Sequence, residues 1–84
     1  MAEQMTNKMA GVVDLNTLTE NGMYRVTSGS TNLPRNESGF VIVYSAMYNG
    51  SMYARQFYWT YDNQMYTRCY WASEWKGWSS FTYQ

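Results

Sequence analysis

Residues 40–81 have the sequence FVIVYSAMYNGSMYARQFYWTYDNQMYTRCYWASEWKGWSSF, and this stretch decides the fold of the 84-residue chain. Its apolar and aromatic residues occur in runs of strand length, and turn-forming residues separate these runs. All four tryptophans of the chain lie within it. The hydrophobic core and any ligand surface must therefore draw on the same aromatic side chains.

The first half of this stretch predicts an antiparallel hairpin. Residues 40–45 begin with five apolar residues in a row, which is typical of a central strand that is covered on both faces. Asn49-Gly50 is the strongest hairpin signal, because both residues tolerate the positive φ of a tight turn. The turn would pair residues 40–45 with residues 52–60. A second turn at residues 61–64 leads to a strand over residues 65–71, and residues 79–83 predict a short closing strand.

The segment before residue 40 predicts one more strand, a long loop and a short helical turn. Residues 23–27 are β-branched and aromatic, which favours a strand. Residues 28–39 form a loop with the only proline, Pro34, and its length makes it a candidate functional loop. Leu33-Pro34 is interpreted as an anchor to the core. Residues 14–19 predict a turn or 3-10 segment with Leu15 and Leu18 packed inward.

The N-terminal residues carry a weaker pattern. Met5 and Met9 are four residues apart, so residues 1–13 can form one or two helical turns of a stalk, and a loose terminal segment is an equal alternative. We divide the chain into a stalk or linker (residues 1–12) and a folded domain (residues 13–84). The predicted class is all-β: a small, twisted antiparallel β-meander with a short N-terminal helical or 3-10 segment.

Composition excludes several functions. Six basic and six acidic residues give no net charge, so neither nucleic-acid binding nor an anionic membrane partner is expected. The aromatic stretch is too often interrupted by polar residues for membrane insertion. One cysteine and no histidine predict no disulfide, no metal site and no cofactor. No apolar run of signal-peptide length occurs near Met1, which predicts synthesis in the cytoplasm.

Catalysis is not expected, whereas sugar binding has a direct chemical rationale. A triad of the usual type needs histidine, and the carboxylates in predicted turns are explained by solvation. A sugar stacks its apolar face on an exposed aromatic ring, and its hydroxyl groups bind amide, carboxylate or guanidinium partners. The candidate ligand-binding residues are Tyr61, Asp62, Asn63, Arg68, Trp71 and Trp75. The alternative is that the tryptophans fill the core or a subunit interface and that Arg68 is a structural arginine between rings.

The order of several short motifs resembles the pyocin-knob domains of phage tail fibres and R-type pyocins. In the first half these are Asp14-Leu15-Asn16-Thr17-Leu18, Asn21-Gly22-Met23-Tyr24-Arg25-Val26, a loop with Asn32 and Pro34, and Gly39 before an apolar strand. In the second half they are Gln56, Met65-Tyr66-Thr67-Arg68 and Trp75-Lys76-Gly77-Trp78. The resemblance covers about residues 13–83. Two features of the chain depart from the family pattern. The aromatic load is higher, especially at Tyr70-Trp71, and Ala72-Ser73-Glu74 stands where glycine-rich turns are common in the family.

The resemblance implies a β-rich knob on a homotrimeric fibre in a virion, near the tip that meets the bacterial surface. The leading hypothesis is a receptor-binding knob that attaches to host-surface glycan. The competing hypothesis is a purely structural module that mediates trimerisation or contacts another virion protein. A third hypothesis is a lectin-like module of a secreted or prophage-encoded enzyme.

Overall fold

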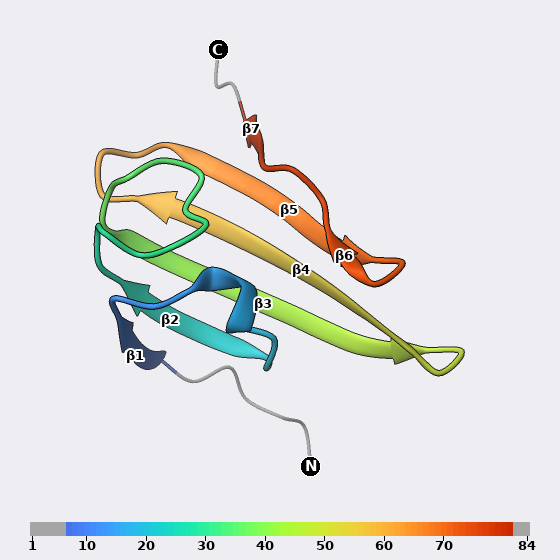
Figure 1. Ribbon diagram of the computed structural model, residues 1–84. Helices are drawn as coiled ribbons and strands as arrows, with labels where there is room; N and C mark the ends of the chain where they lie inside the picture. Colours follow the sequence, from blue (N-terminus) through green and yellow to red (C-terminus); the bar gives the residue numbers. More distant parts are fainter. Residues whose placement is uncertain (1–6, 82–84) are drawn as a thin grey trace.

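The computed structural model describes residues 7–81, which form one mostly antiparallel sheet and a single 3-10 helix (Figure 1). The all-β class and the 3-10 segment predicted from the sequence are confirmed. The elements are, in order, β1 (Asn7–Gly11), η1 (Leu15–Thr17), β2 (Gly22–Val26), β3 (Gly39–Tyr48), β4 (Ser51–Thr60), β5 (Met65–Trp71), β6 (Glu74–Trp75) and β7 (Ser79–Phe81).

The strands follow one another across the sheet in chain order from β1 to β6, and β7 pairs with β5 beside β6. All pairs from β2 onward are antiparallel, whereas β1 runs parallel to β2. A strand over residues 7–11 replaces the helical turn considered for that part of the chain. Met5 lies outside the described residues, and the boundary between residues 12 and 13 stays a prediction.

The turn chemistry explains the long β3–β4 hairpin. Asn49 and Gly50 have φ values of 51° and 80°, so both adopt the left-handed conformation that a two-residue hairpin needs. β3 and β4 stay paired from Gly39↔Thr60 to Tyr48↔Ser51. β2 reaches only to Val43 of β3, so the end of the hairpin projects beyond it (Figure 1).

The core lies on one face of the sheet, under η1 and the loop between β2 and β3 (Figure 1). We call this the covered face. Asp14 caps η1 by accepting a hydrogen bond from the Asn16 N–H at 3.0 Å. Leu33 packs against the core, as the anchor interpretation of Leu33-Pro34 predicts. The buried core residues are Leu15, Leu18, Tyr24, Val26, Val41, Val43 and Tyr58.

The opposite face, which we call the open face, is not covered by any helix or strand of residues 7–81. The expectation that residues 40–45 are covered on both faces is therefore wrong. Val41 and Val43 are fully buried, whereas Phe40 and Ile42 are half-buried and Tyr44 is exposed. The described chain supplies one helical turn and one loop as a second layer, which suffice for a single face of the sheet. The aromatic residues of the open face are Phe40, Tyr44, Tyr48, Tyr53, Phe57, Trp59, Trp71 and Phe81.

Gly39 allows β3 and β4 to approach each other at the start of the core. A Cβ atom at this position would lie 2.0 Å from the backbone oxygen of Trp59, so Gly39→Ala forces the two strands apart. We expect a loss of about 3 kcal/mol of unfolding free energy, measured by urea denaturation. Gly77→Ala is the matched control, because no atom lies within 4 Å of its Cβ position. Equal stability of the two variants would contradict this account.

Candidate functional site

Three of the predicted site residues, Tyr61, Asp62 and Asn63, lie in the turn between β4 and β5. Asp62 accepts a hydrogen bond from the Thr60 hydroxyl, and its second carboxylate oxygen lies 2.9 Å from Arg35 Nη2 in the β2–β3 loop. The hydroxyl first, and then the guanidinium, hold the pKa of Asp62 below its ordinary value. Asp62 thus fastens the turn to the loop, and Asn63 shapes the turn with a φ of 76°. The backbone N–H of Tyr61 donates to the Ser38 carbonyl at 3.1 Å, and the residue is 64% exposed.

Trp71 lies at the other end of β5, on the open face near the projecting hairpin. Its ring centroid is 5.9 Å from that of Tyr53 and 6.2 Å from that of Tyr48. Trp71 is 41% exposed and Tyr48 is 62% exposed. The three rings form a solvent-accessible cluster of the kind that can stack against the apolar face of a sugar.

Arg68 lies on the covered face between two tryptophan rings. Its guanidinium carbon is 4.2 Å from the ring centroid of Trp75 and 4.6 Å from that of Trp78. Its Nε donates a hydrogen bond to Gln56 Oε1 at 2.9 Å, and the side chain is only 6% exposed. Burial lowers the pKa of Arg68 to about 10, and the charge of Asp14 opposes this shift. These surroundings match the alternative interpretation of Arg68, a structural arginine that is held between aromatic rings.

Trp75 also has structural partners. Its indole N–H donates to the Asn16 carbonyl at 3.3 Å, and its ring meets the edge of Tyr70 at 5.4 Å. The indole N–H of Trp78 donates to the Asn32 carbonyl at 3.0 Å. The two tryptophans therefore tie the C-terminal part of the sheet to η1 and to the β2–β3 loop.

The structure does not bring the six candidate residues into one site. Tyr61 and Trp71 belong to opposite ends of β5, which are about 20 Å apart at the rise of an extended strand. Arg68 and Trp75 lie on the covered face, whereas Trp71 lies on the open one. The candidates thus divide into an exposed turn, an exposed ring cluster and a buried arginine between rings.

Further aromatic contacts continue along the open face. Phe40 and Trp59 stack with a centroid distance of 5.2 Å and an interplanar angle of 11°. Phe57 lies 6.4 Å from Trp59 and carries the Arg55 guanidinium 5.9 Å from its ring centroid. These side chains form an apolar and aromatic surface on a sheet face that the described chain leaves open.

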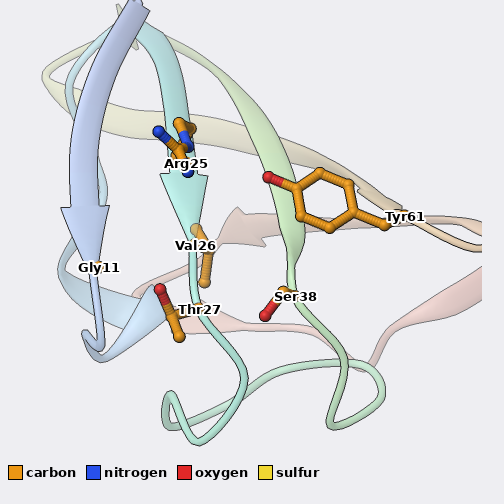
Figure 2. Close-up of a pocket in the computed structure, with 6 residues that line it drawn as sticks. All are labelled: Gly11, Arg25, Val26, Thr27, Ser38 and Tyr61. Carbon is orange, nitrogen blue, oxygen red and sulfur yellow. The ribbon is translucent and has the colours of Figure 1, made fainter.

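A shallow pocket opens beside this surface, where the ends of β1 and β2 approach the end of β4 (Figure 2). It encloses about 340 Å³ of empty space, including the solvent at its mouth. The lining residues are Gly11, Arg25, Val26, Thr27, Ser38 and Tyr61. Sequence reasoning selected only Tyr61 among them. The others come from separate segments, so no local sequence signal identifies them as neighbours.

No group of three or more histidine, cysteine, aspartate or glutamate residues within residues 7–81 is arranged to hold a metal ion. Over the same residues, no helix has the length and apolar character to cross a membrane.

The chain has a pyocin-knob-like fold, as comparison with solved structures shows. A C-terminal fragment of the R1 pyocin fibre of P. aeruginosa matches 96% of this chain, with a TM-score of 0.77 and 23% sequence identity. A C-terminal fragment of the R2 pyocin fibre of P. aeruginosa matches 98% of this chain, again with a TM-score of 0.77 and 23% identity. The chain spans only 22% and 23% of the length of these two fragments. No family model and no curated protein sequence matches the chain.

The network around Arg68 yields a stability prediction. Gln56→Leu removes the acceptor of the buried Arg68 Nε and the donor to the Leu15 and Leu18 carbonyls. We expect it to cost about 3 kcal/mol of unfolding free energy, measured by denaturant titration. The double variant Gln56→Leu/Arg68→Met should lose less than the sum of the two single variants, because it leaves no unpaired buried charge. Additive losses would contradict the coupling.

Proposed function

We propose that this chain is a knob module of a phage or pyocin-type tail fibre that contributes to attachment of the particle to host-surface glycan. The observation that carries this proposal is the likeness of fold to the R1 and R2 pyocin fibre fragments, which extends over nearly the whole chain. In this function the chain is one part of a longer, homotrimeric fibre in a virion, and it acts by binding, without catalysis.

The ring cluster at the projecting hairpin supports the glycan part of the proposal. Tyr48 and Trp71 offer exposed aromatic surface beyond the end of β2, beside the half-buried ring of Tyr53. Asn49 at the exposed hairpin tip adds amide groups next to Tyr48. Stacking surface with a nearby amide is the combination that the hydroxyl groups and apolar face of a sugar need.

Trp71→Ala tests this surface. We expect the wild-type chain to bind glycans on an array of bacterial surface saccharides, and Trp71→Ala to weaken this binding at least about tenfold through loss of the stacked ring. Calorimetric titration with an identified saccharide checks the affinity. Phe81→Ala is the matched control, since Phe81 is also an exposed aromatic residue (46%) but pairs with Met65, at the other end of β5 from Trp71. Equal binding by Trp71→Ala and wild type would exclude the cluster.

The second candidate function is a structural module whose open face packs against other copies of this chain. The observation that favours it is an uncovered apolar surface on the open face, whose side chains are only half-buried in the single chain. These residues are Phe40, Ile42, Phe57 and Trp59. Burial of such apolar area releases about 25 cal/mol per Å². Packing through the open face and attachment to glycan are compatible, because the ring cluster lies beyond the part of β3 that pairs with β2.

Ile42→Glu tests association through the open face. Light scattering at increasing concentration should give three times the mass of one chain for the wild type. The variant should shift this association to higher concentration, because a charge is then buried at the subunit contact. Val12→Glu is the control, since Val12 is 68% exposed and lies outside the sheet. A wild-type mass of one chain at every concentration would contradict self-association through this domain.

A further inference from the structure

Arg25 is an unpaired guanidinium in a chain whose other described basic side chains all have partners. It is exposed on β2 and makes no hydrogen bond or ion pair with the other described residues. The remaining basic side chains that the structure describes each have a hydrogen bond, an ion pair or a ring contact: Arg35, Arg55, Arg68 and Lys76. The charge of Arg25 is therefore available to a ligand.

The surroundings of Arg25 form a pocket without a carboxylate. Thr27 and Ser38 contribute hydroxyl groups, and Tyr61 contributes an exposed ring. Figure 2 shows the hydroxyl of Tyr61 pointing toward the β2 side of the pocket. The Ser38 oxygen accepts a hydrogen bond from the Ser28 N–H at 2.9 Å, which leaves its own proton free to donate to a ligand.

The two carboxylates that adjoin lining residues in the sequence both face Arg35. Glu37 precedes Ser38, and its Oε2 lies 4.0 Å from Arg35 Nη2. Asp62 follows Tyr61 directly, but both of its oxygens are engaged, one by the Thr60 hydroxyl and the other by Arg35 at 2.9 Å. The pocket thus presents one free positive charge, hydroxyl groups and an aromatic ring. Its empty space is about 340 Å³, counting the solvent at its mouth.

We propose that this pocket binds a sugar that carries an oxyanion, such as a uronate carboxylate or a sugar phosphate. A guanidinium binds carboxylate and phosphate through two parallel hydrogen bonds, which an uncharged sugar cannot provide. The Tyr61 ring offers stacking surface to the pyranose, and Thr27 and Ser38 are placed to bind its hydroxyl groups. This inference rests on the proposed attachment to glycan and names the class of glycan at a second place on the domain, apart from the Trp71 cluster.

The affinity for a single sugar should be low. The pocket is shallow and open to solvent, so one charge-assisted contact gives a dissociation constant of about 1 mM. The interaction should weaken with added salt, because exposed charges are screened within about 10 Å at 0.1 M ionic strength. Repetition of the pocket in a multimeric fibre would raise the effective affinity for a polysaccharide.

Chemical-shift titration of the intact chain tests the proposal with three probes: D-glucuronate, glucose 6-phosphate and methyl glucoside. We expect one or both anionic sugars to shift the amide signals of Thr27, Ser38 and Tyr61 saturably, and methyl glucoside to leave them unchanged. The anionic sugar that binds more tightly identifies the source of the oxyanion. Equal shifts with all three probes, or no shift with either anionic sugar, would overturn the proposal.

Arg25→Gln should weaken the binding of the anionic sugar at least about tenfold, because it removes the charged donor. Arg25→Lys should bind with intermediate affinity, since it keeps the charge and loses the paired geometry. Lys76→Gln is the matched control, because it changes the net charge equally while Lys76 pairs with Glu74, away from the pocket. Unchanged binding by Arg25→Gln would overturn the proposal.

The two proposals fail in different ways. Array binding of neutral glycans that is lost in Trp71→Ala, together with no shift by either anionic sugar, would remove the acidic-sugar pocket and retain glycan attachment. Anionic-sugar binding that is lost in Arg25→Gln, together with array binding of other glycans that is equal in Trp71→Ala and wild type, would retain the pocket and remove the Trp71 cluster.

Discussion

The hydrogen bonds of Gln56 hold the two layers of this domain together. Its side-chain N–H groups donate to the carbonyls of Leu15 and Leu18 at 2.7 and 3.0 Å, and its oxygen accepts from Arg68 at 2.9 Å. One fully buried amide thus fixes η1 on the sheet and orients the guanidinium between Trp75 and Trp78. Those rings in turn reach η1 and the β2–β3 loop, so the covered face depends on this contact. A buried amide with all these partners costs little to desolvate, whereas one that has lost a partner is expensive.

Much of the fold follows from local sequence chemistry. Asn49-Gly50 predicts its hairpin because both residues tolerate positive φ, and Asp14 before Leu15 predicts a capped turn. The apolar run at residues 40–45 predicts a central strand, but it overstates burial. Local sequence cannot say whether a second layer exists on each side of a sheet, since that depends on how much of the chain remains to form one. The strand at residues 7–11 was missed for a related reason: its partner β2 is supplied by a distant part of the chain.

The candidate site was less predictable than the fold. Residue types identified Tyr61, Asp62 and Trp71 as suitable for sugar binding, but they could not reveal that Asp62 is held by Thr60 and Arg35. Nor could they separate Trp71 from Trp75, which adjoin the same hairpin turn yet lie on opposite faces of the sheet. The pocket around Arg25 depends on four segments that meet only in the folded chain. Its defining property is a guanidinium that makes no hydrogen bond or ion pair with the other described residues, and this property is visible only in the folded chain.

The projecting end of the β3–β4 hairpin has an evolutionary consequence. Beyond Ser45, whose backbone still binds the Asn21 side chain, β3 pairs only with β4 among the strands of residues 7–81. There the rings of Tyr48 and Tyr53 meet Trp71, away from the buried core. Outside the turn residues Asn49 and Gly50, whose positive φ the hairpin needs, substitutions near the tip therefore change the exposed chemistry of the domain at little cost in folding. The tip can therefore diverge between related chains, while the covered face remains constrained by packing.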